Sequence, residues 1–132
     1  MVPMDTPSDH AESVIDALRS LGLTKYEARV YIALLGVAGA TATEIHEISD
    51  VPRASVYSVL DRLIEKNLVT ISHTTPKRFA AIPPEDGISQ LMQRIEANAG
   101  IASKALSEIH EKQIDLQKVR RKRYGAYRAE SI

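Results

Sequence analysis

The sequence of 132 residues contains no cysteine, no tryptophan and one phenylalanine. Without cysteine, the chain can form neither disulfides nor thiolate metal sites. No apolar run approaches the ~18 residues that a membrane-spanning helix needs, and the first residues lack the basic region and apolar core of a signal peptide. With 44% apolar and 26% charged residues, the composition predicts a soluble, cytoplasmic protein with one modest core and no membrane partner.

The chain also lacks net charge, but its charges are unevenly distributed. Residues 1–50 hold eight acids and three bases, whereas residues 51–84 hold five bases and two acids. The remainder has a small positive excess, concentrated in the run KVRRKR from Lys118 to Arg123. A phosphate backbone responds to local charge rather than to the total, so overall neutrality does not exclude nucleic acid.

Three short helices are expected in the first fifty residues. The run SVIDALRSLGL has apolar residues at helical spacing and stops at Gly22, which suits a helix end. Thr24 and Glu27 then form a capping-box pattern, and Thr41 and Glu44 repeat it before a helix that ends near residue 49 or 50. The pattern therefore predicts two capped helices after the first one.

A fourth helix is predicted to start at Pro52, whose missing N–H suits the first helical position. Only a few residues separate it from the third helix, which is helix-turn-helix spacing. On a helical wheel one side is apolar, and the other is small, hydroxyl-rich and basic near its start. The apolar side contains Val56, Val59, Leu60 and Leu63.

Two short strands are expected after this helix. The runs LVTIS and RFAAIP have strand character, and the polar turn HTTPKR between them carries Lys77 and Arg78 near its end. A β-hairpin directly after a helix-turn-helix predicts a wing with a basic tip.

From Pro84 to about Arg123 the sequence reads as one long helix with a coiled-coil seam. Apolar residues recur at alternating steps of four and three over roughly four heptads. About 35 residues of helix span about 50 Å, more than a small domain needs for its own core, so we expect pairing with a second copy. The alternative is a hairpin with the first helix. The predicted dimerisation positions are Ile88, Met92, Ile95, Ala99, Ala102, Leu106, Ile109 and Leu116.

The predicted fold is therefore mainly α with a small β-hairpin. A winged helix-turn-helix domain over residues 13–84 follows a polar leader, residues 1–12. A coiled-coil dimerisation helix over residues 85–123 and a tail, residues 124–132, complete the chain.

The second helix of a helix-turn-helix reads the major groove of double-stranded DNA, so its outer face supplies the candidate contacts. Each candidate also has a simpler role: the threonines as helix caps, the arginines as solvated or paired cations, and the tyrosine as packing at the core edge. Their order along the chain favours DNA binding. The candidates are Thr41, Thr43, Arg53, Ser55, Tyr57, Ser58, Arg62, Lys77 and Arg78.

The runs LGLTKYEARVYIALL, ATATEIHEISDVPRASVYSVLDRLIEKNLV and PKRFAAIPPED, over roughly Leu21 to Asp86, resemble the N-terminal domain of the TrmB family of archaeal transcriptional regulators. The resemblance implies a winged helix-turn-helix that binds operator DNA as a dimer, with the helix after VPR in the major groove. It favours Arg53, Ser55, Tyr57 and Ser58 as groove contacts, and the two wing cations as further contacts.

Family members continue into a sugar-binding domain, and this sequence has no residues for one. The chain is therefore either a short stand-alone member or a fragment. Sugar recognition is not transferred to it, and the operator, the sign of regulation and any effector stay open. An effector would act between wing and coil, through a partner protein or through oligomer state.

Two functions are compatible with these patterns. The first is a dimeric, sequence-specific DNA-binding repressor or activator. The alternative is a winged-helix protein-interaction module in a transcription or nucleic-acid-processing assembly, which overall neutrality and the acidic first fifty residues suggest.

An enzyme is not expected, and neither is a cofactor or metal site. The histidines His10, His46, His73 and His110 are scattered one to an element, and no glycine-rich phosphate loop or nucleophile elbow occurs. The KVRRKRYGAYR segment is either a nonspecific phosphate contact or a solvated chain end.

Overall fold

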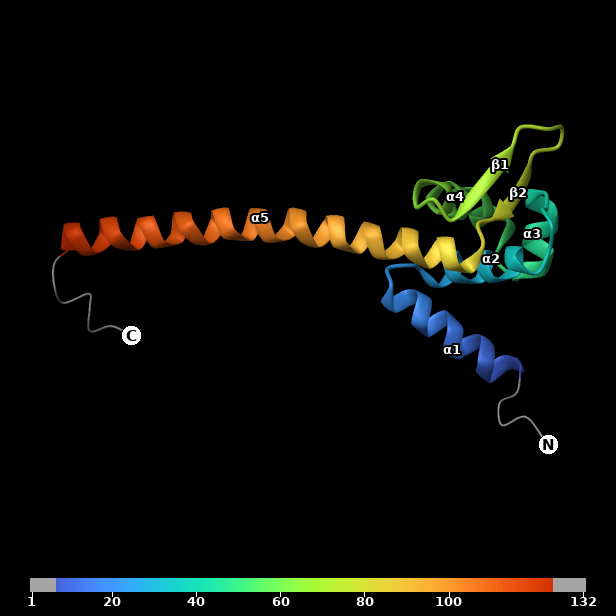
Figure 1. Cartoon of the computed structure of the whole chain (residues 1–132), viewed down its shortest axis with the longest axis horizontal. Coiled ribbons are helices and arrows are strands. Elements are labelled where there is room, and N and C mark those ends of the chain that lie inside the picture. Colours follow the sequence, from blue (N-terminus) through green and yellow to red (C-terminus); the bar gives the residue numbers. More distant parts are fainter. Residues whose placement is uncertain (1–6, 125–132) are drawn as a thin grey trace. The chain divides into compact units, whose positions relative to one another are not determined.

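The computed structural model describes residues 7–124 (Figure 1). The chain divides into a first compact unit that ends at Ile95 and a second that begins at Glu96. None of the described helices is long and apolar enough to cross a membrane. The elements are α1 (Pro7–Ser20), α2 (Lys25–Leu35), α3 (Ala42–Ser49), α4 (Arg53–Glu65), β1 (Val69–Ser72), β2 (Arg78–Ala81) and α5 (Pro84–Tyr124).

Helix α1 begins earlier than the sequence pattern suggested. Residues 7–12, assigned above to a polar leader, are helical. A proline at the first helical position accounts for this start, because its missing N–H would have no partner there. Residues 1–6 of the leader and residues 125–132 of the expected tail lie outside the described residues.

Both predicted capping boxes are confirmed. The Thr24 hydroxyl accepts a hydrogen bond from the Glu27 N–H at 3.1 Å, and the Glu27 carboxylate accepts one from the Thr24 N–H at 2.7 Å. Thr41 and Glu44 make the same pair of bonds at 3.3 and 2.8 Å. Each box satisfies N–H groups that the first turn of a helix leaves free, and so fixes where α2 and α3 begin.

The turn between α3 and α4 is held by side chains of α3. Asp50 adopts a left-handed conformation with φ of 58°, and the Ser49 hydroxyl accepts a hydrogen bond from the Val51 N–H at 3.3 Å. His46 Nδ1 lies 2.7 Å from the Val51 carbonyl oxygen. Pro52 is the residue before α4 rather than its first residue, a one-position correction to the prediction. These contacts define how the chain passes from α3 into α4.

The core of the first unit lies between α1–α4, the hairpin and the start of α5. The predicted apolar side of α4 is confirmed, since all four of its residues are buried. Ile15 and Leu18 of α1 belong to the same core. The apolar side of α1 is therefore already used by the first unit, which argues against the alternative in which α1 pairs with the seam of the long helix.

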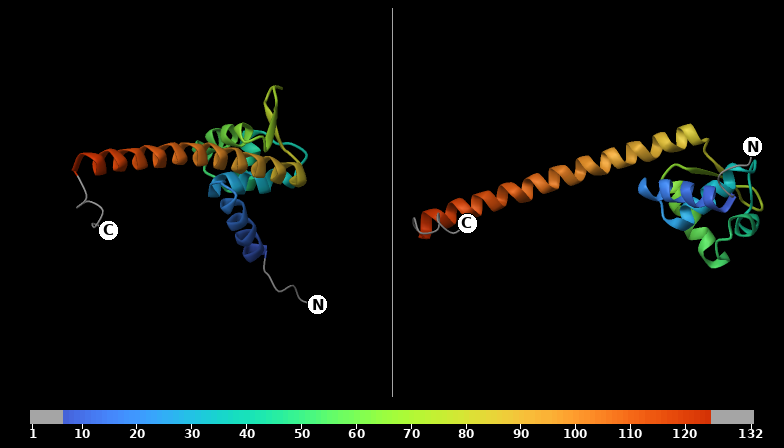
Figure 2. Two further views of the ribbon diagram at one scale, coloured as in Figure 1. Left: turned by 60° about the vertical axis from the view of Figure 1, so that its left-hand side comes forward. Right: turned by 90° about the horizontal axis from the view of Figure 1, so that it is seen from below.

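The predicted hairpin is confirmed as an antiparallel pair in which Val69 lies opposite Ala81. Figures 1 and 2 show it projecting from the helices of its unit. Phe79 of β2 also exchanges two backbone hydrogen bonds with Ala40, at 2.8 and 2.9 Å. This bridge ties the wing to the residue just before the Thr41 cap, so the wing and the start of α3 have a fixed spacing.

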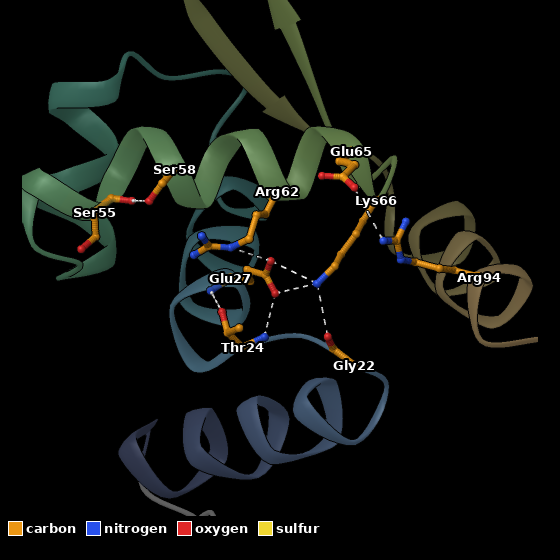
Figure 3. A network of polar contacts seen from close by, with 9 residues as sticks. All are labelled: Gly22, Thr24, Glu27, Ser55, Ser58, Arg62, Glu65, Lys66 and Arg94. Atoms are coloured by element: carbon orange, nitrogen blue, oxygen red, sulfur yellow. Dashed lines mark hydrogen bonds and ion pairs between the residues drawn. The ribbon is translucent and has the colours of Figure 1, made fainter. Parts of the chain in front are cut away.

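A buried carboxylate orients α4 against α2 (Figure 3). The Glu27 side chain is fully buried and binds Lys66 Nζ at 2.8 Å and Arg62 Nε at 3.3 Å. Lys66 also donates to the Gly22 carbonyl oxygen at 3.2 Å. One carboxylate therefore connects the turn before α2, α2 itself and the C-terminal end of α4.

The pKa of Glu27 lies below its ordinary value of 4.5. Burial by itself would raise the pKa of this carboxyl, but hydrogen bonds from Lys66 and the Thr24 N–H, together with the charges of Lys66 and Arg62, outweigh it. Glu27 is therefore ionised in the folded protein at neutral pH.

The first turns of α5 belong to the first unit and pack tightly on its other elements. Leu91 is buried, and the Tyr31 hydroxyl donates to the Ile82 carbonyl oxygen at 2.8 Å. A Cβ added at Gly87 would overlap the Tyr31 hydroxyl and lie 3.3 Å from Leu68 Cδ2. Only glycine fits at this crossing, the point where α5 passes Tyr31 of α2.

We expect Gly87→Ala to lower the free energy of unfolding by about 1–3 kcal/mol, because the new methyl overpacks the crossing. Urea unfolding followed by circular dichroism measures this change. Gly100→Ala in the same helix is the matched control, since nothing lies within 4 Å of its added Cβ. It should stabilise α5 by about 0.5–1 kcal/mol. Equal stability of Gly87→Ala and wild type would contradict the close approach of α5 to Tyr31 at this crossing.

We expect Glu27→Gln to lower the free energy of unfolding at pH 7 by roughly 2–4 kcal/mol, because two cations lose their partner. A lowered folded-state pKa contributes stability that is present above the unfolded value and is lost as pH falls through the folded value. The difference in the free energy of unfolding between wild type and Glu27→Gln should therefore shrink as pH falls below 4.5.

Denaturant unfolding at a series of pH values checks this. Glu65→Gln is the matched control, because it removes the same charge from an exposed side chain that lies 3.9 Å from Arg94. Its effect should stay within about 0.5 kcal/mol. If the difference in the free energy of unfolding stayed constant down to low pH, ionisation of Glu27 would not contribute to stability, and the prediction would be refuted.

Candidate nucleic-acid interface

The N-terminal half of α4 presents the predicted polar face to solvent. Arg53, Tyr57 and Ser58 are exposed and Ser55 is half-buried. Tyr57 is 63% exposed, so its alternative role in packing at the core edge is wrong. Among residues 11–122, whose side chains are described, Arg53 has no carboxylate within ion-pair distance.

An open hollow of about 350 Å³ lies beside this half of α4, where the start of α3 and the wing tip approach it. A smaller hollow of about 190 Å³ continues towards Arg53. Five predicted contacts from three elements therefore line one connected region of the surface. The lining of the larger hollow is Thr41, Ala42, Thr43, Tyr57, Thr74, Thr75, Pro76 and Lys77.

The two cations of the wing have different surroundings. Arg78 donates to the Gly39 carbonyl oxygen at 3.3 Å and lies 3.7 Å from the Glu44 carboxylate. Lys77 has no ion pair within the described part of the chain and lines the larger hollow. Arg78 therefore ties the tip end of β2 to Gly39 and to Glu44 of α3, and Lys77 is the cation that faces the hollow.

Glu44 stays ionised beside this surface. Hydrogen bonds from the Thr41 N–H and hydroxyl, with the nearby charge of Arg78, hold the pKa of the Glu44 carboxyl below its ordinary value. The carboxylate is committed to the cap and to Arg78. Its negative charge is thus partly compensated where a polyanion would approach.

Arg62 lies apart from the other candidates. The sequence pattern placed it on the outer face, with Asp61 or Glu65 of its own helix as alternative partners. Its Nε instead donates to Glu27, 35 positions away. The local pairing is therefore wrong, because a buried carboxylate on α2 is within reach of the same guanidinium.

Two residues have roles that the sequence pattern did not reveal. Glu27 was identified only as a capping-box partner, and His46 only as a surface residue, although both hold neighbouring elements in place. A signal for Glu27 exists: it lies three and seven residues before the buried Val30 and Leu34, on the core-facing side of α2. No such signal marks His46, because its partner is a backbone carbonyl of the turn.

No described part of the chain covers the predicted seam. In the first unit, Ile88, Met92 and Ile95 are between 39% and 52% exposed. In the second unit, every residue from Glu96 to Lys122 is exposed. The unit therefore leaves apolar side chains in solvent, including Leu106, Ile109 and Leu116.

Comparison with known proteins identifies the relatives of this chain. The model of a family described as "Sugar-specific transcriptional regulator TrmB" matches residues 18–85. The sugar-sensing transcriptional regulator TrmBL1 of Pyrococcus furiosus is 31% identical over 99 residues, which are 75% of this chain and 29% of that protein. The DNA-binding transcriptional repressor TrmBL2 of Thermococcus kodakarensis is 28% identical over 96 residues, 73% of this chain and 36% of that protein.

A solved structure of TrmBL2, described as an archaeal chromatin protein with a novel mode of DNA binding, has the same fold. Its TM-score is 0.78 at 21% identity, over 86% of this chain and 46% of that one. The chain spans about a third of the length of these curated relatives, which are transcriptional regulators rather than enzymes. Because the family model covers more than half of its residues, the chain belongs to the TrmB family of DNA-binding transcriptional regulators.

Proposed function

We propose that the chain binds operator DNA sequence-specifically as a homodimer and regulates transcription as a repressor or activator. The observation that carries this proposal is the convergence of cationic and hydroxyl groups from α3, α4 and the wing tip around one open region. An operator on the chromosome agrees with the cytoplasmic location expected from the sequence.

In this proposal α4 enters the major groove with its N-terminal half. Arg53 is exposed at the start of the helix, where a guanidinium can bind guanine O6 and N7 together. Ser55, Tyr57 and Ser58 follow on the outer face and contact bases or phosphates. The Ser58 hydroxyl already donates to the Ser55 carbonyl oxygen at 3.0 Å, so it is available to DNA as an acceptor.

The elements beside α4 contact the phosphate backbone. The Thr41 hydroxyl is committed to its cap, but Thr43 and the N–H groups of the first turn of α3 suit a phosphate. Lys77 of the wing binds the neighbouring phosphate backbone, and Arg78, the next residue, supports it through its contacts with Gly39 and Glu44. Arg62 is left out of this contact set because Glu27 occupies its Nε.

The long helix supplies the dimer in this proposal. Its exposed apolar residues recur at heptad spacing, and a second copy of the same helix would bury them. A dimer presents two groove-reading helices, so its operator is expected to contain two half-sites related by symmetry.

We expect Arg53→Ala to weaken binding to the preferred DNA sequence by about 1–3 kcal/mol, roughly 5- to 150-fold, and to relax selectivity at one base position. Selection from a random duplex pool supplies the preferred sequence, and fluorescence anisotropy measures affinity. Arg19→Ala, an exposed arginine of α1 outside the interface, is the control and should bind like wild type.

Lys77→Ala provides a contrast in the same assay. The substitution should weaken binding to all duplexes similarly. It should also reduce the slope of log affinity against log salt by about 1, as loss of one phosphate contact does. Unchanged binding by both variants would show that the interface is misplaced. Wild type without sequence preference would favour the protein-interaction module.

We expect Leu106→Asp with Ile109→Asp to give monomers in light scattering and weaker operator binding, because paired carboxylates cannot be buried in a seam. Lys104→Gln with Ser107→Asp changes the charge equally at heptad positions outside the seam and should stay dimeric. A dimeric seam variant would exclude this face as the interface.

A further inference from the structure

One side of α4 serves two purposes along its length. Ser55, Ser58, Arg62 and Lys66 are spaced three, four and four residues apart, which places them on one side of the helix. The two serines lie on the proposed DNA face. The two cations, at the other end of the same side, are held by Glu27 (Figure 3).

These contacts restrict rotation of α4 about its own axis. Arg62 and Lys66 are one helical turn apart, and both bind the same carboxylate, at 3.3 and 2.8 Å. The carboxylate is itself immobile, since it is fully buried and accepts the Thr24 N–H at 2.7 Å. Apolar core contacts tolerate repacking, whereas charged hydrogen bonds depend on distance and direction. A small rotation that the core permits would break them.

We propose that Glu27 is a positioning residue for DNA recognition, which sets the rotation of α4 and thereby aims Arg53, Ser55 and Ser58 at the base edges. The inference rests on the proposed function and deepens it. Glu27 touches no DNA in this arrangement. It also compensates two cations of α4, so that Arg62 and Lys66 contribute little sequence-independent attraction to phosphates.

The test compares specific with nonspecific affinity. The specific probe is the duplex that wild type selects from a random pool, and the nonspecific probe is a scrambled duplex of equal length and composition. For Glu27→Gln we expect the ratio of the two affinities to fall about tenfold, within the range for loss of one well-aligned base contact. Nonspecific affinity should stay equal or rise, because two cations are released.

Glu65→Gln is the matched control for charge. It removes one negative charge from the same end of α4, but the Glu65 carboxylate is exposed and lies 3.9 Å from Arg94. Its affinity ratio should match wild type. A fall as large as that of Glu27→Gln would show that charge near α4, not orientation, sets the ratio, and would overturn the proposal.

A second series of variants tests the ion pair between Arg62 and Glu27 without removing the buried carboxylate. It decides whether this ion pair positions α4 if Glu27→Gln does not fold. We expect Arg62→Gln to lower the affinity ratio about threefold, roughly half of a base contact's free energy, and Arg62→Lys to restore it. In both variants the slope of log affinity against log salt should equal that of wild type. A slope reduced by about 1 in Arg62→Gln would instead identify Arg62 as a phosphate contact.

The outcomes separate this inference from the function on which it rests. If wild type selects a sequence but folded Glu27→Gln keeps the wild-type ratio, the positioning role is wrong and operator binding stands. If wild type selects no sequence, both are wrong. Loss of stability in Glu27→Gln with an unchanged ratio for the folded protein would leave Glu27 only a structural role, and would also overturn the proposal.

Discussion

The first unit depends on one constraint: α4 must bury one side completely and leave another in solvent. Its four buried apolar residues satisfy the first requirement. They do not determine how far the helix turns about its axis, because aliphatic contacts adapt to small shifts. The buried Glu27 carboxylate adds directional contacts on a different side of the helix. Hydrophobic burial holds α4 in the core, and the ion pairs set its orientation.

The charges of the chain follow from the same division. Glu27 belongs to the acidic first fifty residues, yet its charge lies inside the protein and is compensated by two cations of the basic segment. Glu44 is committed to a cap and to Arg78. These acids therefore hold the domain together and add little repulsion towards a polyanion. Arg53 and Lys77 form no ion pair with any side chain of residues 11–122.

Local patterns predicted most of the fold because their causes are local. Capping boxes, the apolar side of α4, the hairpin and the long helix each depend on residues within about one element of one another. The exposed polar face of α4 was predicted from the same helical wheel. The partner of Arg62 was not, because it depends on how α2 and α4 pack, and sequence spacing carries no such information. The fit of Gly87 against Tyr31 was missed for the same reason.

The proposed function separates DNA recognition from dimerisation along the chain. Every candidate DNA contact lies in the first unit, whereas five of the eight predicted dimerisation positions lie beyond Ile95 in the second. In the proposed complex, contacts such as those of Glu27 and the Thr41 cap set the geometry within a half-site, and a change in the seam does not touch them. In the same proposal, the seam determines whether two half-sites are bound together. Its middle is rich in alanine and glycine and buries little area, so pairing there contributes modest free energy. In the proposed dimer, a weak seam would make the population of dimers responsive to protein concentration and to DNA that holds both half-sites.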